Sequence, residues 1–275
     1  MRNFSLRGLT AMLSLSCIAL SAPAHADLQK IRQSGILKVA VYNEFAPFSD
    51  KNAGIDVDFA EVLAKKLGLK LSLLPFNAGE NLNDDLRNMV WKGHYLGYGP
   101  ADVLLHVPVD RRLMEENDKV EIFAPYHLET VRLVSNNKTV PNFEGLNSLA
   151  GKKIGVEKIS ISAVVMLGEE NGKYRENVKI FPTAIEALEK LKAGELDAVL
   201  ANRSEIESIL MDDPNFAMNT VQFQRLPRQG WAVGMAVKKD ELELAKLLQA
   251  ATNDLSASGE LANIFMKHSV HIVKP

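Results

Sequence analysis

Short apolar runs that alternate with segments of helical spacing constrain the fold of this chain more than any other feature of its sequence. Ile36–Val41 and Leu69–Leu74 have the length and composition of buried strands. Between them, Ala60, Leu63 and Leu67 recur at the spacing of one helix face. Strands that alternate with amphipathic helices are typical of the α/β class, and no repeat or low-complexity segment interrupts the alternation. The sequence therefore predicts an α/β protein.

The alternation continues to the C-terminus. Asp56 and Thr183 are expected to cap helices at their N-termini, and Gly68 and Gly194 are expected to end helices. Further strands are expected at residues 101–107, 130–135, 153–156, 178–181, 197–201 and 231–237. Further helices are expected at residues 83–90, after residue 160, at 244–255 and at 261–265.

Residues 1–26 have the pattern of a cleavable signal peptide. Arg2 and Arg7 form a positive start, Leu9–Leu20 is an apolar run too short to span a bilayer, and Ala24-His25-Ala26 is a small-x-small cleavage site. The pattern predicts export to the periplasm and a mature chain that begins at Asp27.

Charge and cysteine content narrow the classes of function. Removal of the signal takes Arg2 and Arg7 from the 32 basic residues, so that 30 remain against 34 acidic ones. A net negative chain favours no nucleic-acid partner. Cys17, the single cysteine, leaves with the signal, so we expect neither a disulfide nor cysteine catalysis. Cys17 also raises lipidation as an alternative, although Leu15-Ser16 before it departs from the usual order.

Five segments, spread over nearly the whole mature chain, carry a recognisable order and spacing. They are Gly35-Ile36-Leu37-Lys38-Val39-Ala40-Val41, Ala46-Pro47-Phe48, Gly54-Ile55-Asp56-Val57-Asp58-Phe59-Ala60, Leu149-Ala150-Gly151-Lys152-Lys153-Ile154-Gly155-Val156 and Leu191-Lys192-Ala193-Gly194-Glu195-Leu196-Asp197-Ala198-Val199. Together they resemble the bacterial extracellular solute-binding proteins of family 3, the amino-acid-binding type.

The resemblance implies a type II periplasmic-binding-protein-like fold, in which two α/β lobes are joined by a two-strand hinge and close over a ligand. It places residues 27–123 and 231–275 in the first lobe and residues 124–230 in the second. The hinges are then expected near Ala124–Glu129 and Arg225–Gly230. Pro125 and Pro227 suit such crossings because proline fixes φ and removes a ladder donor.

A closing cleft can desolvate a small polar ligand only if each ligand charge finds a partner. In the family, an arginine that ends a Thr-Pro-Glu-Arg-like turn holds the ligand carboxylate by a two-pronged contact. Pro108-Val109-Asp110-Arg111 resembles that turn, so the resemblance assigns Arg111 to the carboxylate; a surface arginine is the alternative. Ser160 matches a second carboxylate contact, and a helix N-cap is its alternative.

Other cleft positions depart from the family pattern. Asn202 stands where the family has an aspartate for the ligand ammonium, and Tyr42 matches another acidic position. Ile159 replaces a glycine beside the ligand, while Phe45 keeps an aromatic platform. The comparison predicts a cleft that keeps carboxylate recognition and loses ammonium recognition, and it disfavours an ordinary α-amino acid as ligand.

An aromatic, glycine-rich stretch follows the second expected helix, at residues 83–90. It places Trp91, His94, Tyr95 and Tyr98 where simple family members have a short polar link, and such residues favour a binding surface. A flap packed on the first lobe is the alternative. With His106-Val107-Pro108-Val109-Asp110, the stretch resembles a subgroup associated with periplasmic quinoprotein (PQQ) alcohol and methanol dehydrogenases. That resemblance implies an accessory protein that acts through protein contact.

Enzymatic function has less support in the sequence. Some proteins of this fold are dehydratases, and Arg111 with Glu157 could serve such chemistry, but no nucleophile motif, phosphate loop or metal-spaced cluster is present. His94, His106 and His127 are scattered in sequence and are expected to be solvated or packed. We therefore expect no cofactor or metal, a monomer, and as partner either the membrane subunits of an ABC transporter or a quinoprotein dehydrogenase.

Overall fold

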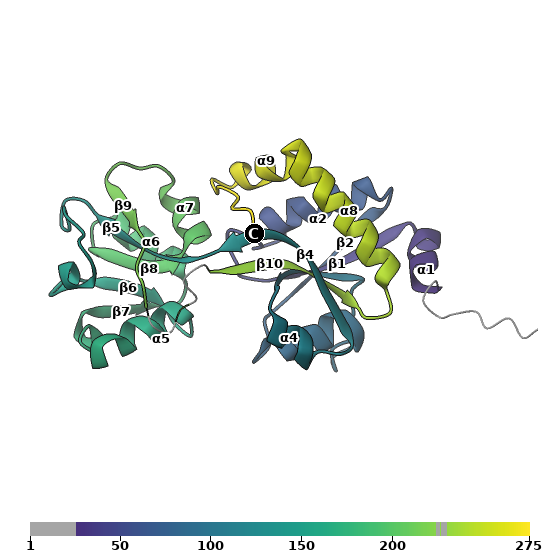
Figure 1. Ribbon diagram of the computed structural model, residues 1–275, viewed down its shortest axis with the longest axis horizontal. Coiled ribbons are helices and arrows are strands. Elements are labelled where there is room, and N and C mark those ends of the chain that lie inside the picture. Colours follow the sequence, from purple (N-terminus) through teal and green to yellow (C-terminus); the bar gives the residue numbers. More distant parts are fainter. Residues whose placement is uncertain (1–25, 224–225, 227–229) are drawn as a thin grey trace, which may run out of the picture.

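The computed structural model describes residues 26–223, 226 and 230–275, and the chain forms two lobes side by side with a narrow waist between them (Figure 1). The expected signal peptide lies outside the described residues, as does most of the stretch expected as the second hinge. The first described helix is α1, Ala26–Ser34.

Lobe 1 is built on a five-stranded sheet of order β2-β1-β3-β10-β4. Strands β1, β2 and β3 are parallel, whereas β10 runs antiparallel to both β3 and β4. Its strands are β1 (Ile36–Tyr42), β2 (Lys70–Phe76), β3 (Val103–Pro108), β4 (Val120–Glu129) and β10 (Trp231–Lys238). Its helices are α2 (Ile55–Lys66), α3 (Leu82–Leu86) with the π-turn Arg87–Trp91, α4 (Arg111–Glu116), α8 (Leu242–Ser258) and α9 (Glu260–Lys267).

Lobe 2 is built on a second sheet of order β7-β6-β8-β5-β9. Strands β7, β6 and β8 are parallel, and β5 pairs antiparallel with β8. Its strands are β5 (Val131–Asn136), β6 (Ile154–Glu157), β7 (Val178–Phe181), β8 (Ala198–Asn202) and β9 (Phe216–Asn219). Its helices are α5 (Ile161–Gly168), α6 (Ala184–Lys192) and α7 (Arg203–Leu210), with short 3-10 turns at Leu146–Leu149, Glu169–Asn171 and Arg175–Asn177.

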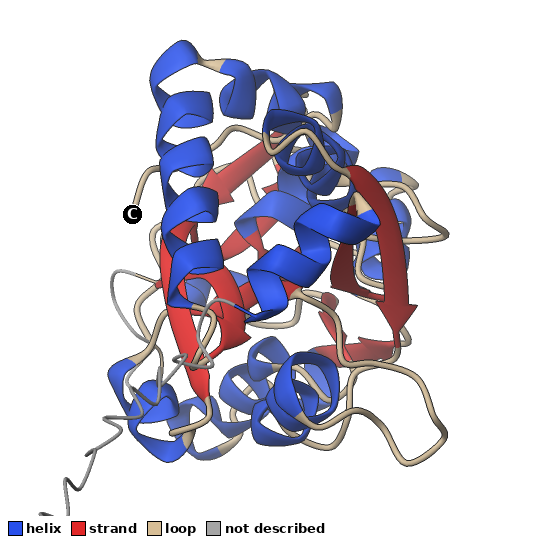
Figure 2. Ribbon diagram, turned by 90° about the vertical axis from the view of Figure 1, so that its right-hand side faces the viewer, coloured by secondary structure: helices blue, strands red, loops and turns tan. Residues whose placement is uncertain are grey.

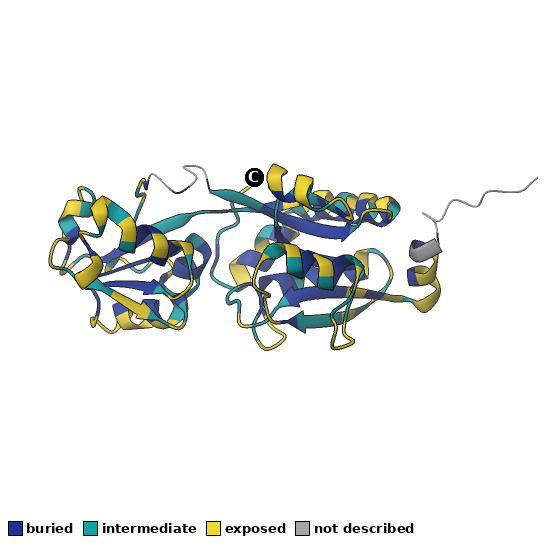
Figure 3. Ribbon diagram, turned by 90° about the horizontal axis from the view of Figure 1, so that it is seen from below, coloured by how far each residue is buried: buried dark blue, intermediate teal, exposed yellow. Residues whose placement is uncertain are grey.

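Helices cover both faces of the lobe 1 sheet, the nearer one in Figure 2, and apolar clusters lie on both faces of the lobe 2 sheet, which is why the central strands are continuous apolar runs. In β1, Val39 packs toward α2 and α8, while its neighbour Ala40 packs on the opposite face with the residues after α3. In β8, Leu200 and Ala201 divide between the two faces in the same way. Figure 3 shows these strands as buried ribbon inside each lobe. Each lobe therefore has its own hydrophobic core.

The chain crosses between the lobes at the cleft. Strand β4 pairs with β10 from Val120 to Glu129, and β5 begins two residues later at Val131, so Thr130 alone separates the two sheets. The chain returns between β9 and β10. The C-terminal tail also bridges the lobes, because Leu128 of β4 donates to the Val273 carbonyl at 2.9 Å and His271 donates to Glu207 of α7 at 2.7 Å.

Thr183 and Gly194 bound helix α6 as predicted, but the expected cap at Asp56 is wrong. Gly54 is the N-cap of α2, and a Cβ there would lie 2.3 Å from the Phe48 carbonyl oxygen, which explains the glycine. Asp56 lies inside the helix. Its side chain is buried, and it accepts a hydrogen bond from the Tyr126 hydroxyl at 2.9 Å.

Candidate functional site

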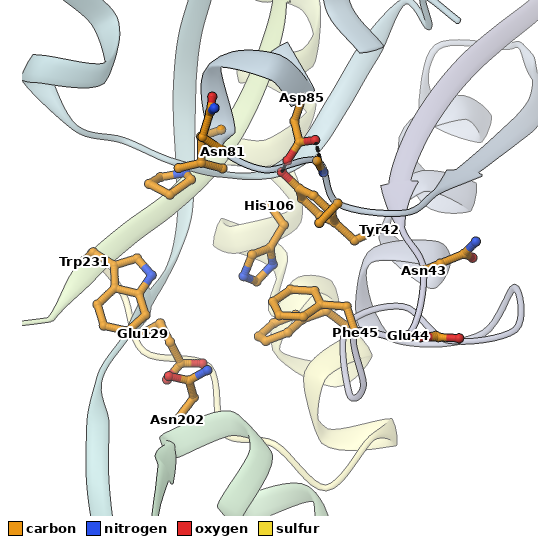
Figure 4. Close-up of a pocket in the computed structure, with 15 residues that line it drawn as sticks. Tyr42, Asn43, Glu44, Phe45, Asn81, Asp85, His106, Glu129, Asn202 and Trp231 are labelled. Carbon is orange, nitrogen blue, oxygen red and sulfur yellow. Dashed lines mark hydrogen bonds between the residues drawn. The ribbon is translucent and has the colours of Figure 1, made fainter. Parts of the chain in front are cut away.

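A cavity of about 460 Å³ opens between the lobes where the strands of both sheets end. Tyr42, Pro108 and Asn202 are the last residues of β1, β3 and β8, and all three line it. Carboxyl ends of parallel strands are the usual place for a ligand site in open α/β sheets. Glu129 at the end of β4 and Trp231 at the start of β10 line the cavity where the chain crosses between the lobes (Figure 4).

A second cavity, of about 230 Å³, adjoins the first on the side of lobe 2. It is lined by Glu157, Ile159, Ser160 and Glu205, among others, and it shares Asn202 and Trp231 with the first cavity. We call the two cavities together the cleft.

The lobe 1 wall of the cleft is aromatic. Phe45 stacks on Phe48 at 5.4 Å between ring centroids and meets Tyr42 edge-on at 5.8 Å. The Tyr42 hydroxyl donates to Asp85 at 3.2 Å, and the Gly79 backbone N–H donates to the other Asp85 oxygen at 2.7 Å. Burial raises the pKa of Tyr42 well above its usual value, with a further contribution from Asp85, so the phenol keeps its proton. Both oxygens of Asp85 therefore have partners.

Two histidines pack against this wall: His106 lines the larger cavity (Figure 4), and His127 is buried outside the lining. His106 packs on Phe48 at 4.0 Å between ring centroids, and its Nδ1 lies 3.2 Å from Asp56. His127 Nδ1 accepts a hydrogen bond from the Val273 N–H at 3.2 Å, which places the proton of the neutral ring on Nε2, 3.1 Å from the Ser204 hydroxyl. Burial lowers the pKa of His127 to about 3. These residues, scattered in sequence, are packed close together.

The lobe 2 side and the crossing carry carboxyl groups. Glu129, Glu157 and Glu205 line the cleft, and burial is the main cause that raises the pKa of each. Glu205 accepts a hydrogen bond from the Asn202 backbone N–H at 2.8 Å, as one half of a capping box at the start of α7. No lysine or arginine is among the described residues that line the cleft.

Four of the five predicted ligand contacts lie at the cleft. Tyr42, Phe45 and Asn202 line the larger cavity and Ser160 the smaller one. Ser160 is also the N-cap of α5, as the alternative predicted, since its hydroxyl accepts from the Ala163 N–H at 3.1 Å. Arg111 does not line the cleft. Its side chain is 92% exposed and pairs with Glu115 one helical turn later at 2.8 Å.

The aromatic stretch lies away from the cleft, because it precedes β3 whereas the cleft lies at the end of β3. Trp91 ends the π-turn and packs partly buried on the lobe 1 core. His94 lies 4.3 Å from the rings of both Tyr95 and Tyr98. Tyr95 is 88% exposed and the adjacent Leu96 is 68% exposed, so this loop presents apolar surface to solvent.

Several residues that line the cleft were not predicted from the sequence, because only positions that match the family's own ligand contacts were considered. Asp85, Glu129, Glu205 and Trp231 all line the cleft, yet none lies in a matched segment. Glu129 and Trp231 could have been suspected from their place beside the expected hinges. Asp85 and Glu205 come from helices, and only the packing of those helices brings them to the cleft.

The described residues show no group of three or more histidine, cysteine, aspartate or glutamate side chains arranged to hold a metal ion. In the same part of the chain, none of the helices has the length and apolar character that a membrane span requires.

Comparison with known proteins gives binding proteins over nearly the whole chain and an enzyme over a short part of it. No family model matches the chain. It is 25% identical to a probable histidine-binding protein of Neisseria gonorrhoeae, with 94% of each chain aligned, and 23% identical to the L-cystine-binding protein TcyJ of Escherichia coli K12, with 92% of each aligned. A match of 40% identity to a cyclohexadienyl dehydratase of Pseudomonas aeruginosa covers 72 residues, 22% of this chain and 27% of that protein.

Among solved structures, an ancestral cationic amino acid solute-binding protein superposes with a TM-score of 0.67 at 19% identity, covering 88% of this chain and 99% of the other. An amino-acid ABC transporter substrate-binding protein of Streptococcus pneumoniae, bound to L-arginine, superposes with a TM-score of 0.61 at 21% identity, covering 90% and 99%. The chain thus has the type II periplasmic-binding-protein-like fold predicted from sequence. The two relatives that align over more than nine tenths of both chains are bacterial amino-acid-binding proteins.

Proposed function

We propose that this protein is a periplasmic solute-binding protein that holds a small amino-acid-like solute in the interlobe cleft and delivers it to the membrane subunits of an ABC transporter. The observation that carries the proposal is a cleft formed by the strand ends of both lobes, at the point where Thr130 alone separates the two sheets. A rotation at such a crossing brings the two walls together over a solute and removes water from it. Export by the signal peptide of residues 1–26 belongs to the same proposal.

A solute carboxylate would be received at the start of α5. Ser160, Ile161 and Ser162 line the smaller cavity at the N-terminus of this helix, where backbone N–H groups and the helix dipole favour an anion. Arg111 remains the predicted second contact. It can contribute only by leaving Glu115 and turning toward Pro108, which does line the cleft.

A thermal-shift screen of residues 27–275 against amino acids, amines and organic acids tests the proposal. A solute at about 100 times its dissociation constant stabilises the folded state by about 2.7 kcal/mol, which is a shift of several degrees for a chain of this size. A saturable shift, followed by calorimetric titration with a stoichiometry of one, is the expected result. A screen in which no solute shifts the midpoint would contradict solute binding.

The exposed aromatic loop favours a second function, that of an accessory protein to a periplasmic quinoprotein dehydrogenase. Tyr95 and Leu96 present apolar surface in the loop before β3 and line neither cavity of the cleft, so a partner there would leave the cleft open. The test is co-purification of the exported protein with quinoprotein dehydrogenases. Replacement of Tyr95 and Leu96 by serine should abolish the association, and retained association would exclude the loop as the contact.

A further inference from the structure

A third segment joins the lobes besides the two crossings of the chain. The C-terminal tail, residues 268–275, leaves α9 of lobe 1 and runs to the waist of the molecule, where C marks its end in Figure 1. It contacts β4 of lobe 1 and α7 of lobe 2. None of its residues is among the described residues that line the cleft, so solute binding gives it no role.

The tail is anchored to lobe 1 by apolar side chains and by strand β4. Val270 is fully buried in the lobe 1 core, and Ile272 packs against the same core from a partly buried position. Leu128 of β4 donates its backbone N–H to the Val273 carbonyl at 2.9 Å, and the Val273 N–H donates to His127 Nδ1 at 3.2 Å. Because β4 lies at the edge of the lobe 1 sheet, the tail pairs with the side of β4 that faces away from β10.

His271 lies between these anchors and contacts lobe 2. Its backbone N–H donates to Glu207 Oε2 of α7 at 2.7 Å, and its ring Nδ1 lies 3.5 Å from the same oxygen. Glu207 is 5% exposed, and its other oxygen accepts from Arg203 Nε, one turn earlier on α7, at 2.5 Å. A nearly buried carboxylate thus has one donor from its own helix and another from the tail.

A second route connects the tail to α7 through His127. The Val273 N–H occupies Nδ1 of this ring, so the neutral ring carries its proton on Nε2, which lies 3.1 Å from the Ser204 hydroxyl. Both His127 and Ser204 are buried. Ser204 and Glu207 are three residues apart on α7 and therefore share one face of that helix. Both routes meet the same buried polar face of α7.

These contacts bear on the motion of the lobes because they span the crossing at Thr130. A rotation there carries α7, which follows β8 of lobe 2, relative to the tail, which is packed on lobe 1. A hydrogen bond of 2.7 Å between two packed groups has little slack, so it favours the one angle between the lobes at which it forms. A hydrogen bond to a charged group shifts an equilibrium by roughly tenfold or more.

We propose that the C-terminal tail holds the two lobes apart and releases lobe 2 when the cleft closes. Glu207 and His271 are positioning residues in this device, since they act on the angle between the lobes and not on a solute. A closed form gives up their contact, so the tail lowers the fraction of closed molecules and, with it, the apparent affinity for a solute. The inference concerns the unliganded protein and does not depend on which solute it binds.

The experiment measures the distance between the lobes without any solute. Residues 27–275 contain no cysteine, so two spin labels can be attached at introduced cysteines. Glu80→Cys in lobe 1 and Val164→Cys in lobe 2 are exposed positions close in sequence to residues that line opposite walls of the cleft. Pulsed electron spin resonance then gives the distribution of distances between the labels. The protein with its tail in place should give a narrow distribution.

Two variants release the tail in different ways. Glu207→Ala removes the acceptor of the His271 N–H, and a chain that ends at Val270 removes His271 and Val273 but keeps the buried anchor. Each should raise the ratio of short to long distances about tenfold, since the contact with α7 is lost. If Glu207→Ala does not fold, as judged by circular dichroism, the shortened chain decides the outcome.

Glu195→Ala is the matched control, because Glu195 is a lobe 2 carboxylate that pairs with Lys190, also of lobe 2, at 3.0 Å. Its distance distribution should equal that of the protein with its tail in place. An unchanged distribution in either folded variant would overturn the inference, and so would a shift to longer distances.

Discussion

The two walls of the cleft differ in how completely their polar groups are satisfied. On lobe 1, Tyr42 and Gly79 occupy both oxygens of Asp85, and stacked rings fill the space around them. At the crossing and on lobe 2, three carboxyl groups line the cleft, and Ser204 and the Thr130 N–H act on the Glu129 carboxyl against the effect of its burial. The polar groups of the lobe 1 wall thus have partners within the wall, whereas burial raises the pKa of the three carboxyl groups on the other side and favours their neutral form.

Removal of the Phe48 ring should destabilise the aromatic wall of lobe 1 more than any other substitution considered below. Phe48 is almost fully buried and packs on Phe45 and His106, so Phe48→Ala should lower the free energy of unfolding by about 3–5 kcal/mol. Urea denaturation monitored by circular dichroism measures the change. Val164→Ala, an exposed position on α5 of lobe 2, is the control and should change stability by less than about 0.5 kcal/mol. A small effect of Phe48→Ala would show that the rings do not hold the lobe 1 wall.

The region behind the wall should make the protein sensitive to acid. Burial depresses the pKa of His127 to about 3 in the folded state, whereas the unfolded value is near 6.5, so the unfolded state binds the extra proton first. The contribution of His127 to the free energy of unfolding is therefore fully present above about pH 6.5. It falls by at most about 1.4 kcal/mol for each pH unit as the pH drops toward 3.

Unfolding titrations of the wild type and of His127→Gln across that pH range provide the measurement. Glutamine does not titrate, so the variant should show a shallower dependence of stability on pH. Identical slopes for the two proteins would refute the assignment of the acid sensitivity to His127.

Relief of backbone strain at Ile159, on the lobe 2 wall, should stabilise the protein. This residue is 98% exposed and has a φ of 56°, a left-handed conformation that is strained for a β-branched side chain. Ile159→Asn should therefore raise the free energy of unfolding by about 1 kcal/mol, because asparagine tolerates this conformation and no packing is lost. Ile159→Ala is the matched control, since alanine retains most of the strain. An asparagine variant no more stable than the alanine variant would contradict the explanation.

The smallest expected effect concerns Arg111. Its pairing with Glu115 is exposed on α4, so Arg111→Ala should change the free energy of unfolding by less than about 0.5 kcal/mol. The affinity of the same variant for L-arginine and for agmatine, which lacks the carboxylate, then tests the role assigned from sequence. A loss confined to L-arginine would place Arg111 on the carboxylate in the closed form, and unchanged affinities would remove it from the site.

Strands with a clear apolar pattern were predicted closely. Helices that are short, or that bury polar residues against other parts of the fold, were not. The runs that became β1, β6 and β8 were predicted within a residue or two, because strands in the interior of a sheet covered on both faces are continuous apolar segments. Helix α4 begins at Arg111 and is only six residues long, so its apolar pattern is too short to be recognised. Helix α7 was missed because its polar residues Ser204, Glu205 and Glu207 are buried against the crossing and the C-terminal tail.

The sequence by itself determined the α/β class, the two-lobe fold through its five matched segments, and the presence of Tyr42, Phe45, Ser160 and Asn202 at the cleft. The α/β class follows from local patterns, since strand length, helix periodicity and end residues are written within a few positions of the chain, whereas the two lobes and the cleft residues were implied by the resemblance to family 3. Only the tertiary structure decided which charged groups line the cleft. Glu129, Glu157 and Glu205 come from separate elements, and their convergence depends on sheet order and on the crossing at Thr130, which no local pattern encodes.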